Sequence, residues 1–381
     1  MRFQNLLVVV SSGAALTSVA LADELFVPSP EFPTIQAAID ASVAGDEVVL
    51  LSGTFSGSGN MDLRMPRWPI TIRGETGDPA DVIIERSGSQ GRAMIFASSP
   101  LGTVVADLTI SRFFPLDGAA IFASNSEILF DNCVIQDNRA DMDDCSIRSR
   151  GGAVMQRNGV LRFVDCVFRN NQASGTTCNG SGGMGSGGSG GAIYAEGGQT
   201  ILERCQLDGN AGAGAQLGSS AGGAIVGGRV VLIDSILVGN VTGGRGIGGA
   251  VSAGELVSIN TDFIDNVAYA SDAPTRGGAI AASQATIIGG RIIGNRSGDP
   301  VFASEGRGGA VFADTLEMAN VVLVNNRAFG YSGPEDVHGR AIRLRGEATL
   351  TNVLFLDNQS RTGDALYAVE GPVQLNNCIV D

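Results

Sequence analysis

The sequence contains no lysine, because all 25 of its basic residues are arginine, and it has a single histidine, His338. Lysine is therefore excluded as a catalytic base, and a Ser-His-Asp triad has no support beyond that one histidine. Tryptophan occurs once and aromatic residues make up 6% of the chain, which argues against extensive stacking on sugar rings. The net charge of −14 argues against a nucleic-acid partner, since the phosphates would be repelled.

Long apolar runs are also scarce, and the one that stands out lies at the N-terminus. Residues 1–2 give a basic start, residues 6–16 are mostly apolar, and Ala20-Leu21-Ala22 is an A-x-A cleavage motif. This pattern predicts a signal peptide over residues 1–22, cut near Ala22, and a secreted, periplasmic or cell-surface protein. A membrane anchor is the alternative, but the run is short for one, and we expect no transmembrane segment in the mature chain.

Glycine, by contrast, is abundant, with 55 residues, and much of it belongs to a repeated tetrad. The tetrad Gly-Gly-Ala-(Ile/Val) begins at Gly151, Gly190, Gly222, Gly248, Gly277 and Gly308, with degenerate copies at Gly118, Gly339 and Gly363. Each copy predicts a turn that needs a positive φ or a close backbone approach.

A second repeated mark is a bulky apolar residue three places before an asparagine. The asparagines are Asn138, Asn171, Asn210, Asn240, Asn266, Asn295, Asn326 and Asn358, and the intervals between them run from about 26 to about 39 residues. The apolar members predict a stacked core: Ile135, Phe168, Leu207, Leu237, Phe263, Ile292, Leu323 and Phe355. The asparagines predict a ladder at a turn, where Asn tolerates unusual backbone angles and its amide bonds to the next coil.

Small residues fill the column two places before each apolar position, among them Cys133, Cys166 and Cys205. By strand alternation they face the same side as the apolar column. They therefore predict a core ladder of reduced thiols, with a disulfide bridge between coils as the alternative that the coil spacing permits. A metal site is unfavoured because no histidine lies nearby. Cys378 occupies the same column.

The order of elements predicts a solenoid with a cap. Thr34 precedes Ile35, Ala38 and Ile39, which share one face of a short helix. From about Leu101 onward, short strands alternate with turn residues without helical periodicity, so they stack in parallel only by winding as a β-helix. We expect an all-β chain with a cap and first coils over 23–100 and repeats over 101–381. The repeats stop inside a coil at Asp381, which predicts a truncated chain, an association surface or a frayed end.

Two resemblances follow from these residues. The segment 34–40, together with 45–50 and 53–55, resembles the N-terminal cap of pectate-lyase-like right-handed parallel β-helices. The tetrads, with Phe-Arg-Asn-Asn at 168–171, Phe-Ile-Asp-Asn at 263–266 and Phe-Leu-Asp-Asn at 355–358, resemble the repeats of chlamydial polymorphic outer-membrane proteins. The resemblance implies a single-stranded right-handed β-helix with an N-terminal capping helix. It also implies a binding, adhesion or structural role, with a surface polysaccharide or a protein as the ligand and no required cofactor.

The pectate-lyase-like group also contains polysaccharide lyases and hydrolases, so an enzyme acting on acidic polysaccharide is the alternative function. The two functions predict different sheet surfaces. A lyase predicts a groove along one sheet that holds several carboxylates with an arginine, whereas a binding role predicts no clustered acid, base and cation site. Asp131 and Asp165 occupy nearly matching positions in neighbouring repeats, and Asp265 and Asp357 share a column, but neither pair is favoured as a catalytic pair.

Two insertions, at residues 139–150 and 173–189, carry the remaining candidates. Cys145 and Cys178 each lie seven residues beyond a ladder asparagine, which predicts a disulfide between adjacent loops, with two free thiols as the alternative. Asp141, Asp143 and Asp144 offer hard oxygen ligands and form a candidate Ca²⁺ site, with a solvated acidic loop as the alternative. For a β-helix lyase the resemblance implies that Ca²⁺ neutralises a uronate. The base is then an arginine, and Arg148 and Arg150 are nearest to the cluster.

Overall fold

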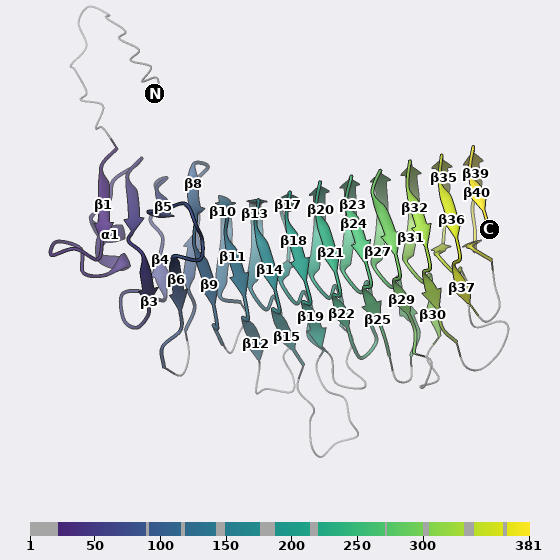
Figure 1. The fold of residues 1–381 in the computed structure, drawn as a ribbon, viewed down its shortest axis with the longest axis horizontal. Coiled ribbons are helices and arrows are strands. Elements are labelled where there is room, and N and C mark those ends of the chain that lie inside the picture. Colours follow the sequence, from purple (N-terminus) through teal and green to yellow (C-terminus); the bar gives the residue numbers. More distant parts are fainter. Residues whose placement is uncertain are drawn as a thin grey trace, which may run out of the picture.

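The computed structural model describes residues 22–88, 91–115, 119–141, 149–175, 187–213, 220–270, 273–299, 305–330, 339–360 and 364–381. These residues form an elongated rod in which successive coils stack side by side (Figure 1). Every strand pair is parallel, and each strand pairs with the equivalent strand of the next coil. The predicted fold class, an all-β right-handed parallel β-helix, is confirmed.

A short helix, α1 (Ile35–Ala41), lies near the N-terminal end of the rod and is the one helix among the described residues (Figure 1). Thr34 is its N-cap, and the Thr34 hydroxyl accepts a hydrogen bond from the Ala37 N–H at 3.3 Å. Ile35, Ala38 and Ile39 are buried. The predicted cap and its apolar face are therefore confirmed, and the helix covers core that the first coil would otherwise expose to water.

The largest sheet, called the long sheet, contains 18 strands within the described residues. From β13 to β31 its coils begin at the Gly-Gly-Ala tetrads. Its strands are β1 Glu24–Val27, β2 Glu47–Leu50, β4 Leu63–Arg64, β5 Thr71–Gly74, β7 Met94–Ala97, β8 Thr103–Ala106, β10 Ile121–Asp131, β13 Val154–Val164, β16 Ile193–Ala195, β17 Gln199–Glu203, β20 Ile225–Ile233, β23 Val251–Ile259, β27 Ile280–Ile288, β31 Val311–Ala319, β34 Ile342–Leu344, β35 Ala348–Thr351, β38 Leu366–Ala368 and β39 Val373–Asn376.

The second sheet, called the middle sheet, follows the long sheet in each coil and carries the apolar column. Its described strands are β3 Gly53–Phe55, β6 Val82–Glu85, β9 Thr109–Ser111, β11 Val134–Gln136, β14 Val167–Arg169, β18 Gln206–Asp208, β21 Ile236–Val238, β24 Asp262–Ile264, β28 Arg291–Ile293, β32 Val322–Val324, β36 Leu354–Leu356 and β40 Ile379–Val380.

The third sheet, called the short sheet, follows the asparagine column. Its described strands are β12 Arg139–Asp141, β15 Gln172–Ser174, β19 Ala211–Ala213, β22 Val241–Thr242, β25 Val267–Ala268, β29 Arg296–Ser297, β33 Arg327–Ala328 and β37 Gln359–Ser360. A separate pair, β26 Thr275–Arg276 and β30 Gly306–Arg307, precedes two of the tetrads.

The glycine tetrad has a different requirement at each of its two glycines. Gly190 has a φ of 65°, in the left-handed region that favours glycine. Gly191 lies so close to the next coil that an added Cβ would collide with the carbonyl oxygen of Gly223. Both requirements predicted from the sequence are therefore present: the first glycine has a positive φ, and the second allows a close backbone approach.

The apolar column forms the core of the middle sheet, as predicted. Phe263, for example, pairs in register with Ile292, and the ladder runs without a break from Ile135 to Phe355. All eight side chains of the column are fully buried. Since each one packs against its equivalents in the coils on either side, the column fixes the register of the rod.

Candidate functional site

The outward surface of the long sheet changes its chemistry along the rod. One outward row lies six residues before each apolar core residue, and it pairs in register from coil to coil. In order along the rod the row reads Leu129, Arg162, Ile201, Val231, Val257, Thr286, Glu317, Thr349 and Gln374. It is thus aliphatic over β17, β20 and β23 and polar from β27 onward.

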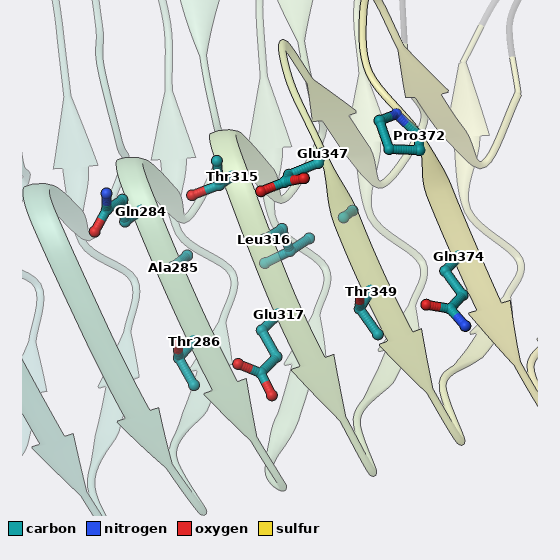
Figure 2. A pocket seen from close by; sticks show the side chains of 11 residues that line it. Gln284, Ala285, Thr286, Thr315, Leu316, Glu317, Glu347, Thr349, Pro372 and Gln374 are labelled. Carbon is teal, nitrogen blue, oxygen red and sulfur yellow. The ribbon is translucent and has the colours of Figure 1, made fainter.

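A groove of about 480 Å³ follows the polar part of this row. Its walls come from four successive coils, through β27, β31, β35 and β39 and the residues that directly precede the last two strands. Figure 2 shows one line of side chains formed by Thr286, Glu317, Thr349 and Gln374 and a second formed by Gln284, Thr315 and Glu347. The groove therefore crosses the strands and runs along the rod axis.

The floor of the groove is formed by strand residues whose side chains are buried, and its sides carry many hydrogen-bonding groups. Ala285, Leu316 and Ala348 face the core and are at most 5% exposed. The neighbouring outward side chains are amides, hydroxyls and two carboxylates, Glu317 and Glu347. Such a surface both donates and accepts hydrogen bonds, and none of the described lining residues is aromatic.

Sequence reasoning missed these groove residues. The signal that would have found them is the column six places before the apolar ladder, where Val257 gives way to Thr286 and then Glu317. The lyase hypothesis predicted a groove with several carboxylates and an arginine. The structure places two carboxylates in the groove, and Arg345 lies in the short connection between β34 and β35, the strand that carries Thr349.

The pair Asp131 and Asp165 lies at a corner of the rod, away from the groove. Two nitrogens of Arg204 donate hydrogen bonds to Asp165, at 2.8 and 2.9 Å, and these bonds lower the pKa of the Asp165 carboxyl. Burial, together with the nearby Asp107 and Asp165, raises the pKa of Asp131. Asp165 is thus committed to an ion pair. The other pair, Asp265 and Asp357, occupies exposed turn positions with φ of 52° and 51°.

The eight ladder asparagines form a continuous buried hydrogen-bond chain. In each step, the backbone N–H and the side-chain amide of one asparagine both donate to Oδ1 of the next. For Asn210 and Asn240 both distances are 3.0 Å. The side-chain amide of Asn240 also donates to the Leu207 carbonyl at 3.0 Å. The prediction of unusual backbone angles at these asparagines is wrong, because the positive φ lies at the preceding residue, such as Asp265. The role of this ladder is structural.

The cysteines Cys133, Cys166 and Cys205 lie at the corner between the long and middle sheets and are free and buried. The Cys133 N–H donates to the Cys166 sulfur at 3.4 Å, and the Cys166 thiol donates to the Val164 carbonyl at 3.2 Å. Burial raises the pKa of the Cys166 thiol well above its usual range. A protonated, buried thiol is a poor nucleophile and a poor metal ligand, so this column belongs to the core.

Most candidates in the two insertions lie outside the described residues, namely Asp143, Asp144, Cys145, Arg148 and Cys178, as does His338. Of Asp141, only the backbone, in β12, is described. This strand pairs in register with β15 as far as Asp141 and Ser174. The segments that lead from the two asparagines toward Cys145 and Cys178 are therefore equivalent up to these two residues. Arg150 forms an ion pair with Glu196 at 3.4 Å and lies over the Tyr194 ring.

Two absences concern only the described part of the chain. Its histidine, cysteine, aspartate and glutamate side chains form no group of three that would hold a metal ion. Within the same ranges, no helix has the length and apolar character needed to cross a membrane.

Comparison with known proteins finds only distant structural likeness. No protein-family model and no curated protein matches the sequence. A mannuronic acid specific polysaccharide family 6 lyase from human gut microbiota is 16% identical, with a TM-score of 0.44, over 91% of this chain and 82% of the lyase. The A-module of the Azotobacter vinelandii mannuronan C-5 epimerase AlgE6 is 12% identical, with a TM-score of 0.43, over 91% and 93%. The pectin methylesterase of Aspergillus niger is 12% identical, with a TM-score of 0.31, over 93% and 86%. At these values the likeness carries no argument about activity.

Proposed function

We propose that the protein binds an extended polysaccharide along the groove of the long sheet and acts as a binding or adhesion protein without catalysis. The observation that carries this proposal is the pair of polar lines that runs over four successive coils. Neighbouring strands lie about 4.8 Å apart, so four strands span about 14 Å. A linear polymer that presents hydroxyl groups at regular intervals matches a surface that repeats its hydrogen-bonding groups at regular intervals.

The same groove argues against a protein ligand, although the sequence leaves that alternative open. Protein interfaces draw most of their affinity from large buried anchors, often aromatic, that fill apolar pockets. The outward lining here consists of Gln, Thr, Glu and Pro side chains and offers no such pocket. Hydrogen bonds to sugar hydroxyls suit these side chains better.

The test is a binding titration of the full chain against a panel of neutral and acidic polysaccharides. The double variant Glu317→Ala/Thr349→Ala removes two neighbouring members of the polar line, and we expect it to weaken binding by about tenfold. The control variant is Val231→Ala, at the equivalent outward position of a coil outside the groove. If the double variant binds as well as Val231→Ala, the proposed groove is wrong, and binding of a protein in place of every polysaccharide has the same consequence.

A second candidate function is elimination or hydrolysis of an acidic polysaccharide. It is favoured by Glu317 and Glu347 in one groove, with Arg345 in the connection between two strands of the long sheet, β34 and β35. Incubation with acidic polysaccharides, with and without Ca²⁺, distinguishes the two functions. New reducing ends or unsaturated uronides would replace the binding proposal with an enzymatic one, and binding without cleavage supports the first.

Three sequence predictions are retained as proposals. We propose export with cleavage after Ala22, which the N-terminal sequence of the mature protein tests. We propose a disulfide between Cys145 and Cys178, which peptide mapping under non-reducing conditions tests. We propose a Ca²⁺ site at Asp141, Asp143 and Asp144, and we expect calorimetric titration of Ca²⁺ into the metal-free protein to show heat of binding. A titration without heat of binding would contradict this site.

A further inference from the structure

An arginine-rich corner adjoins the groove and shares strands with it. It contains Arg276, Arg307, Arg343 and Arg345, together with the carboxylates Glu305 and Asp314. Four guanidinium groups therefore stand against two carboxylates within the described residues. The formal charge of the whole chain is −14, so this is a local excess of positive charge on an acidic protein.

The corner is organised around the ring of Phe312, which is 5% exposed. The guanidinium of Arg276 lies 5.3 Å from the ring centroid, and that of Arg345 lies 5.7 Å from it. Attraction between each cation and the ring offsets the repulsion between the two cations. Phe312 thus holds two positive charges close to each other on the same aromatic ring.

The two cations differ in how many of their donors are used. Arg345 Nε donates to Asp314 Oδ1 at 2.8 Å. Arg276 has no ion pair with any carboxylate in the described ranges, although a guanidinium offers five N–H donors. Burial and the nearby Arg345 and Arg307 lower the pKa of Arg276. An anion placed between Arg276 and Arg345 would favour the charged form of Arg276 and so offset both its burial and its repulsion by the neighbouring arginines.

A pocket of about 160 Å³ opens at this place. Arg276, Arg345 and Phe312 line it, and Ser252 and Ser283 add hydroxyl groups. Pockets for drug-sized ligands measure roughly 300 Å³ or more, so this one fits a single charged group. Asp314 also lines the pocket, and its ion pair with Arg345 offsets the carboxylate charge.

We propose that this pocket binds an oxyanion group, a carboxylate or a sulfate ester, carried by the polysaccharide that occupies the groove. Guanidinium groups pair with the oxygens of such groups in a planar, often bidentate geometry. The pocket and the groove meet on the same strands, because Ser283 precedes Gln284 and Asp314 precedes Thr315. The polymer would therefore present hydroxyl groups to the groove and an acidic group to the pocket. This inference rests on the proposed function in its choice of ligand.

The experiment measures the affinity of the full chain for dextran, carboxymethyl dextran and dextran sulfate of equal length. These probes share one backbone, so the comparison isolates the charged group and distinguishes a carboxylate from a sulfate ester. We expect at least one charged dextran to bind more tightly than dextran. Arg276→Gln should reduce that affinity by about tenfold and leave dextran binding unchanged. The gain should also shrink as the salt concentration rises.

The control is Arg229→Gln, which removes an arginine of the long sheet, in β20, outside the pocket. Equal affinity for all three dextrans, or unchanged affinity for the charged ones in Arg276→Gln, would overturn the oxyanion pocket without touching the groove. If Arg276→Gln weakens binding while Glu317→Ala/Thr349→Ala does not, the pocket is supported and the groove is the part that fails.

Discussion

The inward and outward sides of this solenoid follow different rules, although they belong to the same coils. Inside, two columns keep their residue type: asparagine follows asparagine through eight coils, and large apolar residues follow one another from Ile135 to Phe355. Outside, the row six residues earlier changes from Ile201, Val231 and Val257 to Thr286 and then Glu317. An inward side chain meets its own equivalents above and below, and an outward one meets solvent or a ligand. A departure from the repeat is therefore informative only on the outside.

The largest effect expected to separate the two sides comes from the core. Phe263 is fully buried between Leu237 and Ile292, so Phe263→Ala leaves a cavity. We expect the free energy of unfolding to fall by roughly 3–5 kcal/mol, measured by urea denaturation followed by circular dichroism. Val257→Ala, on the outward side of the same coil, should cost less than about 1 kcal/mol. Equal losses would remove the distinction between the sides.

The asparagine ladder should give the next largest effect. Asn240→Ala removes the acceptor for the backbone and side-chain N–H groups of Asn210, and both lie in a buried environment. The Leu207 carbonyl loses its donor as well. We expect a loss of roughly 2–3 kcal/mol in the same assay, because unpaired buried polar groups are costly.

Asn376 provides the matched control for the ladder. It is exposed, and its amide makes one long hydrogen bond of 3.4 Å. Asn376→Ala should change the free energy of unfolding by no more than about 0.5 kcal/mol. If Asn240→Ala were as mild as this control, the ladder would contribute little to stability and would need another explanation.

The smallest effect concerns an outward position and depends on pH. The raised pKa of Asp131 means that its ionised form is disfavoured in the folded state, so its contribution to stability is lost as pH rises through that pKa. Asp131→Asn should therefore stabilise the protein at pH 7 by at most about 1 kcal/mol, and the gain should vanish near about pH 3, where aspartate is protonated.

Asp165→Asn should change stability in the opposite direction. Arg204 lowers the pKa of Asp165, so this ion pair stabilises the protein above the ordinary aspartate pKa and is lost as pH falls. Solvent screens the exposed pair, which keeps the loss at pH 7 small. Melting temperatures of both variants at the two pH values test the signs, and a loss of stability in Asp131→Asn at neutral pH would contradict the assignment.

The rod could be predicted from the sequence alone. Thr34 with Ile35, Ala38 and Ile39 was enough to predict the capping helix, and the apolar column was enough to predict the register. The signal for the helix is local, and the apolar column recurs in every coil, so both can be detected in the sequence alone. The structure around the asparagines could be predicted in part. Their bonding to the next coil follows from their chemistry, but only the structure places the positive φ one residue earlier, as at Asp265.

The proposed ligand site could not be predicted from the sequence alone. Gln284, Glu317 and Glu347 lie on three successive coils, at offsets of eight, six and eight residues before the apolar ladder, but only the structure shows that they line one groove. Arg276 and Arg345 are farther apart still, and they meet because both pack against Phe312. Polar residues such as these are common in the chain and gain meaning only from their neighbours. The repeat determines how the coils stack, whereas the site depends on which unlike side chains that stacking brings together.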